Sequence, residues 1–124
     1  MALSAEDRLA ILNLTARYNF AIDNGEADVW ASTFTTDGVF DSMMGTHSGT
    51  AALQAFAADF AVKMAGAEHW VSNQEINGNG ETATHRCYLQ LIKVESGESL
   101  GRAKYNDELV KVDGEWKFTK RIVR

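Results

Sequence analysis

Apolar residues recur at helical spacing in the first part of the chain. Ile11 and Tyr18 fall on one face of a segment that runs to Asn24-Gly25. Ser4 followed three residues later by Asp7 has the form of a capping box, in which two side chains satisfy free N–H groups at a helix start. Glycine tolerates the left-handed conformation that commonly ends a helix. The pattern therefore predicts a first helix from Ser4 to Asn24-Gly25.

Two shorter helices are predicted to follow. Two large aromatic residues four positions apart indicate a helix over residues 28–34. Residues 50–64 are rich in alanine and carry larger apolar residues at helical spacing, which indicates a third helix. Turn-forming residues occupy the stretch between them, so we expect a short strand at residues 39–41 and a loop at residues 45–49.

The second half of the chain has the sequence pattern of β-strands. Turn signals such as Asn-Gly and Asp-Gly separate four stretches, which are residues 68–76, 82–94, 102–112 and 115–123. Short turns between long strands join antiparallel neighbours. Helices followed by such a meander predict one α+β domain over residues 1–124, with about three helices on a strongly curved mixed or antiparallel sheet. Its concave mouth would suit a small apolar ligand.

The alternation of side chains assigns the two faces of the sheet. In the last strand, Trp116 and Phe118 are expected on one face and Arg121 on the opposite face. Both faces carry apolar residues. One face could therefore serve a pocket and the other an oligomer interface.

Charge and hydropathy exclude several classes of function. The formal net charge is −5, with acids and bases dispersed along the chain, whereas nucleic-acid binding needs clustered Lys and Arg. No apolar run approaches the ~20 residues that cross a bilayer. The N-terminus lacks the basic start and apolar stretch of a secretory signal. We expect a cytoplasmic protein with no nucleic-acid or membrane partner.

Metal and disulfide chemistry are not expected. Cys87 is the single cysteine, so an internal disulfide and a Cys-based zinc site are excluded. No two histidines lie four apart on a helix or alternate along a strand, so a histidine metal site is not expected either. The chain also has no phosphate-binding loop and no dinucleotide fingerprint, and no cofactor is expected.

The residues do allow acid–base catalysis by a histidine paired with an aspartate. A histidine held by a carboxylate is the commonest general base, and the chain offers three His and eight Asp, hence 3 × 8 = 24 possible pairs. His69 and His85 lie in predicted strands and are better candidates than His47, which lies in a predicted loop. The alternative to a catalytic role is that each of these strand histidines is an ordinary half-buried side chain whose hydrogen bonds are satisfied. Composition does not choose among these pairs.

The chain resembles the SnoaL-like branch of the NTF2-like superfamily over nearly its whole length. The matching features are Tyr18 with Ile22-Asp23-Asn24-Gly25, Trp30 with Phe34-Thr35-Thr36-Asp37-Gly38-Val39-Phe40, Gly49, His69 with Asn73, Gly101-Arg102 with Tyr105-Asn106-Asp107-Glu108-Leu109, and Asp113-Gly114-Glu115-Trp116-Lys117-Phe118. This resemblance implies a cone in which helices and a curved sheet enclose an apolar pocket.

The resemblance also implies a site. Asp23 and His69 fall where scytalone dehydratase, bile-acid 7α-dehydratase and hexachlorocyclohexane dehydrochlorinase place an Asp–His dyad. Tyr18 matches a tyrosine of the bile-acid enzyme, where the dehydrochlorinase has lysine, and Arg121 matches an arginine in the dehydrochlorinase's last strand. The expected substrate contacts are Trp30, Phe34, Phe40, Val71, Asn73, His85, Cys87, Leu89, Tyr105 and Asp107.

The implied reaction needs no cofactor. His69, oriented by Asp23, would remove a proton from carbon, Tyr18 would hydrogen-bond the developing negative oxygen, and Arg121 would stabilise negative charge at the pocket rim. The expected protein is a lyase of the dehydratase type that acts on a small apolar ring of the steroid or polyketide kind. It is expected to form a homo-oligomer, either a dimer or a trimer.

Two other functions stay open at this point. One is an isomerase of the ketosteroid isomerase kind, or a polyketide cyclase, with Tyr18 as the oxyanion donor, Asp41 as the base and Asp107 as a possible protonated acid. The other is a domain that binds a small molecule or mediates assembly without catalysis.

Overall fold

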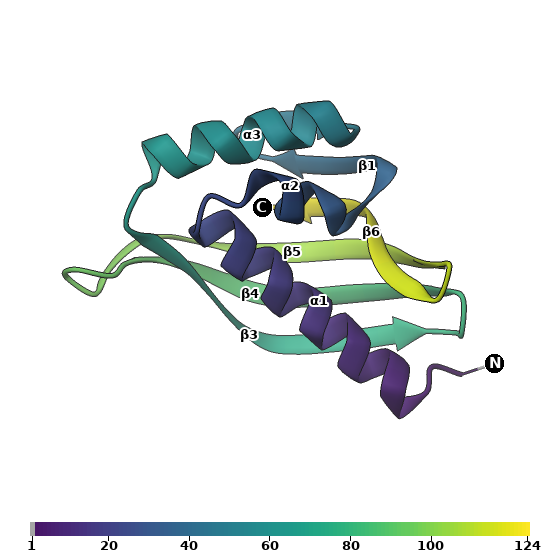
Figure 1. The fold of residues 1–124 in the computed structure, drawn as a ribbon. Coiled ribbons are helices and arrows are strands. Elements are labelled where there is room, and N and C mark those ends of the chain that lie inside the picture. Colours follow the sequence, from purple (N-terminus) through teal and green to yellow (C-terminus); the bar gives the residue numbers. More distant parts are fainter. Residues whose placement is uncertain (1) are drawn as a thin grey trace.

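The computed structural model describes residues 2–124, which form three helices packed on one six-stranded sheet (Figure 1). The helices are α1 (Ala5–Asp23), α2 (Ala27–Ser32) and α3 (Thr50–Lys63). The capping box is present, because the Ser4 hydroxyl accepts the Asp7 N–H at 3.0 Å and the Asp7 carboxylate accepts the Ser4 N–H at 3.5 Å. All three predicted helices are thus confirmed, with small shifts at their ends. No helix in residues 2–124 has the length and apolar character needed to span a bilayer.

The sheet is mixed. Its strands are β1 (Phe34–Ser42), β2 (Gly45–Ser48), β3 (Ala67–Gly78), β4 (Thr82–Lys93), β5 (Glu98–Val112) and β6 (Glu115–Val123). They lie in the order β2-β1-β6-β5-β4-β3, and every neighbouring pair is antiparallel except β1 and β6, which are parallel. The prediction of a loop at residues 45–49 is wrong. Strand β1 runs on to Ser42, and its free edge pairs with β2 in a hairpin.

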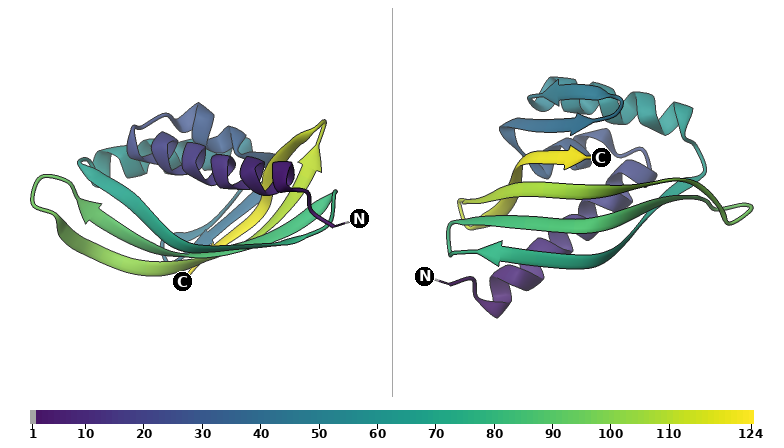
Figure 2. Two further views of the ribbon diagram at one scale, coloured as in Figure 1. Left: turned by 90° about the horizontal axis from the view of Figure 1, so that it is seen from below. Right: turned by 180° about the vertical axis from the view of Figure 1, so that it is seen from behind.

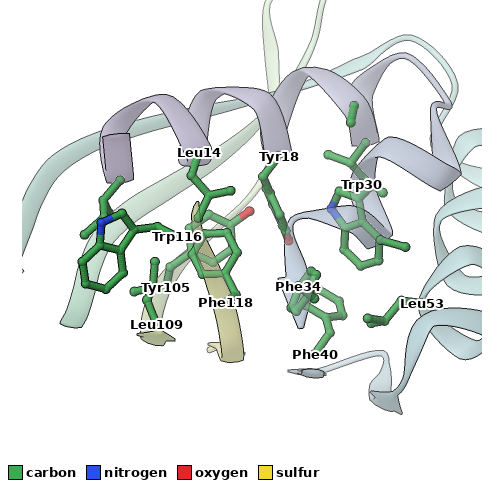
Figure 3. Packing of buried hydrophobic residues seen from close by; sticks show 14 of the residues in the cluster. Leu14, Tyr18, Trp30, Phe34, Phe40, Leu53, Tyr105, Leu109, Trp116 and Phe118 are labelled. Atoms are coloured by element: carbon green, nitrogen blue, oxygen red, sulfur yellow. The ribbon is translucent and has the colours of Figure 1, made fainter. Parts of the chain in front are cut away.

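The sheet curves strongly, and α1 lies across its concave face (Figure 2). Helix α3 contacts β1 and β2 (Figure 1). The core between these layers is rich in aromatic rings. Tyr18 of α1 packs against Trp30, Phe34 and Phe118, with ring centroids 5.4, 6.1 and 5.7 Å away (Figure 3). Because aromatic side chains bury large apolar areas, this cluster fixes the position of α1 on the sheet.

An extra residue in β6 changes which side chains face the core. Thr119 has no partner opposite it in β5, so it forms a β-bulge. The bulge shifts the alternation by one residue, and Arg121 therefore faces the core together with Trp116 and Phe118. The prediction that Arg121 lies on the opposite face is wrong for this reason.

Strand β3 contains a second irregularity. One extra residue lies between Ser72 and Glu75, where Asn73 adopts a positive φ of 61°. A residue in this conformation bends the strand. The bend lets the side chain of Gln74 reach His85 on the neighbouring strand.

Candidate active site

The end of α1 and the start of β3 form a carboxylate–imidazole pair. Asp23 is the last residue of α1 and His69 lies near the start of β3. The Nδ1 atom of His69 lies 2.6 Å from Asp23 Oδ1, and the His69 backbone N–H donates to both carboxylate oxygens at 3.1 Å. A carboxylate accepts only, so the proton of the neutral imidazole sits on Nδ1. The other nitrogen, Nε2, is then the atom able to accept a proton.

The ring of His69 lines an apolar cavity of about 170 Å³. The cavity lies between the helices and the concave face of the sheet. Aromatic and aliphatic side chains form most of its wall, among them Phe60, whose ring centroid lies 5.5 Å from that of His69. The hairpin between β1 and β2 contributes Met43 and Met44, which are exposed. These two flexible apolar side chains form an exposed part of the cavity wall.

Tyr18 brings a phenol into the same cavity wall. It lies on α1, one and a half turns before Asp23, and only 1% of it is exposed. Burial raises the pKa of this phenol above its ordinary value, and the charge of Arg121 opposes the rise. At neutral pH Tyr18 is therefore protonated and can donate a hydrogen bond. The structure thus brings Tyr18, Asp23 and His69 together around one cavity.

Arg121 does not lie at the cavity rim. It is 0% exposed, and its Nε and Nη2 atoms donate to the two oxygens of Asp107 at 2.7 Å each. Its guanidinium packs against the rings of Tyr105, Phe118 and Tyr18, at 3.7, 4.2 and 4.3 Å from their centroids. The expectation of a rim position is wrong, because the β6 bulge turns this side chain into the core.

A second His–Asp pair is buried beside Arg121. The Nδ1 atom of His85 lies 2.7 Å from Asp107 Oδ2, and its Nε2 atom lies 3.0 Å from the Gln74 side-chain oxygen. Burial raises the pKa of the Asp107 carboxyl, but the charge and hydrogen bonds of Arg121 outweigh burial and hold the pKa below its ordinary value. Asp107 is therefore ionised, and the role of a protonated acid does not fit it.

The expected substrate contacts divide into two groups. The cavity wall includes Trp30, Phe40, Leu89 and Tyr105. It does not include Phe34, Val71, Asn73, His85, Cys87 or Asp107. Phe34 is packed into the aromatic core. Asn73 is exposed at the bulge in β3. Cys87 is buried, and burial raises the pKa of its thiol to about 11.

Several wall residues were missed by sequence reasoning. They are Ile22, Ser42, Met43, Met44, Phe56, Phe60, Leu91, Gly101, Arg102, Ala103 and Val123. The alternation of β4 places Leu91 on the same side as Leu89, so that residue could have been found. Val123 could not, because it follows the bulge that shifts the alternation in β6.

Asp41 is held outside the cavity wall. Its carboxylate accepts hydrogen bonds from Arg124 Nη2 at 3.0 Å and from the Thr46 hydroxyl at 3.1 Å. These hydrogen bonds, that of Arg124 first, lower the pKa of Asp41. A carboxylate stabilised in this way is a weaker base. Within residues 2–124, no three His, Cys, Asp or Glu side chains are grouped so that they could hold a metal ion.

The chain belongs to the SnoaL-like domain family, whose model matches residues 3–122. No curated protein matches the chain. A protein of unknown function with a cystatin-like fold from Nostoc punctiforme is 29% identical, with a TM-score of 0.94 over 99% of this chain and 93% of that one.

Two structures from Novosphingobium aromaticivorans are also similar. An NTF2-like protein with a cystatin-like fold is 27% identical, with a TM-score of 0.87 over 95% of this chain and 80% of that one. A protein provisionally named scytalone dehydratase is 23% identical, with a TM-score of 0.81 over 95% of this chain and 83% of that one. The chain therefore has the NTF2-like fold that its sequence resemblance predicted, and the α+β class is confirmed.

Proposed function

We propose that the chain is a cofactor-independent lyase of the dehydratase type, with His69 as the general base. The observation that carries this proposal is the 2.6 Å contact between His69 Nδ1 and Asp23 at the wall of an apolar cavity. Asp23 orients the ring and stabilises the imidazolium that forms when Nε2 takes a proton. A positioned general base of this kind contributes about 10²–10⁴-fold to a reaction rate. The similar structure provisionally named scytalone dehydratase is consistent with this reaction class.

The proposed elimination uses two residues of the cavity wall. His69 Nε2 takes the proton from the carbon next to a substrate carbonyl, and the electron pair moves onto the carbonyl oxygen to give an enolate. Tyr18 donates a hydrogen bond to that oxygen, where the charge develops. The enolate then collapses to a carbon–carbon double bond, and the hydroxide that leaves the next carbon takes the proton from His69 and departs as water.

The size of the cavity narrows the proposed substrate. Its volume of about 170 Å³ is close to the roughly 150 Å³ of an engineered protein cavity that binds benzene. We therefore propose a compact β-hydroxy ketone of one or two rings, of the polyketide kind, as the substrate. A steroid would require the cavity to widen, for example by movement of Met43 and Met44.

Turnover of small cyclic β-hydroxy ketones tests the proposal. The enone product absorbs at longer wavelength than the substrate, so the reaction can be followed by ultraviolet spectroscopy. We expect turnover by the wild type and a loss of about 10²–10⁴-fold in kcat/KM for His69→Ala. The matched control is His47→Ala, which changes the histidine that lies on β2 outside the cavity wall. Circular dichroism and thermal unfolding should show that both variants fold.

The same experiment separates the competing functions. An isomerase or cyclase that uses Asp41 as its base would lose activity in Asp41→Ala and keep it in His69→Ala. The hydrogen bonds from Arg124 and Thr46 argue against that base. A binding domain would hold apolar ring compounds with no turnover, and tight binding of the ketones without enone formation would overturn the proposed lyase.

A further inference from the structure

Three buried side chains and the exposed Gln74 form a continuous chain of hydrogen bonds. Gln74 contacts His85 Nε2 at 3.0 Å, His85 Nδ1 contacts Asp107 at 2.7 Å, and Asp107 receives two hydrogen bonds of 2.7 Å from Arg121. The side chains of His85, Asp107 and Arg121 have no solvent exposure. Groups this deeply buried interact at low effective dielectric, so the positions of their charges have strong effects on their neighbours.

The chain ends against two tyrosine rings of the cavity wall. The guanidinium carbon of Arg121 lies 3.7 Å from the ring centroid of Tyr105 and 4.3 Å from that of Tyr18. Both tyrosines line the cavity, whereas Arg121 does not. The two rings meet edge to face, with their centroids 5.9 Å apart. Arg121 therefore contacts two residues of the cavity wall without itself lining the cavity.

The hydrogen bonds of Arg121 are not fully satisfied. Asp107 shares its carboxylate between Arg121 and His85. The third guanidinium nitrogen, Nη1, is buried and has no hydrogen-bond partner within residues 2–124. A cation against the face of a phenol ring is attracted by the ring electrons. It also stabilises negative charge on the phenol oxygen, which makes the O–H group a stronger hydrogen-bond donor.

We propose that Arg121 is a positioning residue that strengthens Tyr18 as a hydrogen-bond donor to the cavity, and that Asp107, His85 and Gln74 hold the guanidinium against the ring. Arg121 acts through Tyr18 and does not touch the bound molecule. The pKa of Tyr18 agrees with this role, since burial raises this pKa and the charge of Arg121 opposes the rise. The effect on a substrate enolate rests on the proposed lyase function, but the effect on the phenol itself does not.

Titration of Tyr18 tests the inference without any substrate. The chain has three tyrosines, Tyr18, Tyr88 and Tyr105, so incorporation of difluorotyrosine gives three ¹⁹F NMR signals that single Tyr→Phe variants assign. Difluorotyrosine titrates at lower pH than tyrosine, which keeps the measurement within the range where the protein is folded. Tyr88 is half exposed and serves as the internal reference.

The informative variant is the neutral pair Arg121→Gln with Asp107→Asn. Removal of both charges avoids leaving one buried charge unpaired, so the fold is expected to survive. We expect the titration midpoint of Tyr18 to rise by about one unit or more, a tenfold or larger change in its acid constant, with Tyr88 unchanged. Arg121→Lys keeps the charge and should retain most of the wild-type midpoint.

Two results would overturn the inference. One is a Tyr18 midpoint in the neutral pair equal to that of the wild type. The other is an Arg121→Lys midpoint equal to that of the neutral pair, because charge would then not be the cause. These outcomes are independent of turnover: a shifted Tyr18 midpoint with no elimination activity supports the inference and counts against the lyase, and an unshifted midpoint with turnover lost in His69→Ala does the reverse.

Discussion

The protein contains two His–Asp pairs with nearly the same internal geometry and different surroundings. In both, Nδ1 faces the carboxylate, at 2.6 Å for His69 with Asp23 and 2.7 Å for His85 with Asp107. His69 lines the cavity, and its Nε2 atom makes no hydrogen bond to any of residues 2–124. His85 has its Nε2 against Gln74 and its aspartate bound to an arginine.

The comparison shows that the pair itself does not define a catalytic group. What the second ring nitrogen faces decides what the histidine can do. A free Nε2 at a cavity can take a proton from a ligand, whereas an Nε2 that is already bonded can only hold neighbouring side chains in place. We therefore expect damage to the first pair to affect turnover and damage to the second pair to affect stability.

The largest expected effect comes from Asp23→Asn. The substitution keeps the size of the side chain but removes the negative charge that stabilises the imidazolium. In the Ser-His-Asp triad the same change lowers kcat by about 10⁴-fold through the wrong histidine tautomer, and we expect a loss of similar order here. Steady-state kinetics with a turned-over β-hydroxy ketone measures it. Activity within tenfold of the wild type would show that Asp23 does not orient the base.

Arg121→Met should cause the largest loss of stability. It leaves the carboxylate of Asp107 buried without its ion-pair partner, which costs about 3–5 kcal/mol in the free energy of unfolding. Urea denaturation followed by circular dichroism measures the loss. The matched control is Arg124→Met, whose ion pair with Asp41 is exposed and should contribute less than about 1 kcal/mol. Equal losses in the two variants would contradict the assignment of Arg121 to a buried network.

His85→Phe and His69→Phe compare the two histidines directly. His85→Phe removes the hydrogen bonds to Asp107 and Gln74, and leaving the buried Asp107 carboxylate without this partner costs about 1–3 kcal/mol. His69→Phe should unfold at nearly the urea concentration of the wild type and lose its turnover, because its ring borders a cavity. Denaturation midpoints and kcat, measured on the same two preparations, give both quantities. If His69→Phe unfolded at a lower urea concentration than His85→Phe, the assignment of the second pair to stability would be contradicted.

The smallest effect on stability is expected at Asp7, an aspartate that is not paired with a histidine. Hydrogen bonds from Trp116 and Lys111 lower the pKa of Asp7 from 3.8 to about 2. Because the folded pKa lies below the unfolded one, the ionised carboxylate stabilises the fold above about pH 4, and this contribution disappears as the pH falls from about 4 toward 2. The urea midpoint should fall less steeply across this window in Asp7→Asn than in the wild type. Identical slopes would rule out this linkage.

Much of the fold could be predicted because it follows from local rules. The capping pair Ser4 and Asp7, the helix end at Gly25 and the short turns between long strands each act over a few residues. The hairpin at residues 45–48 could not be predicted, because β2 is short and polar and forms only where the edge of β1 is free. Its pairing depends on tertiary context.

The site was only partly predictable. Composition allowed 24 His–Asp pairs, and the family resemblance, not any local pattern, selected Asp23 with His69. The burial of Arg121 depends on one unpaired residue in β6, and the contact of His85 with Gln74 depends on another in β3. Bulges carry no strong sequence signal here, so the face predicted for Arg121, which lies beyond the bulge in β6, was inverted.

The place of β6 in the sheet has a consequence for synthesis on the ribosome. β6 is the last strand along the chain, yet it lies between β1 and β5 and provides the parallel pairing that joins the β1–β2 hairpin to the β3–β5 meander. Pairing of such distant segments closes a long loop and is slow. The nascent protein therefore carries two unjoined pieces of sheet until β6 emerges.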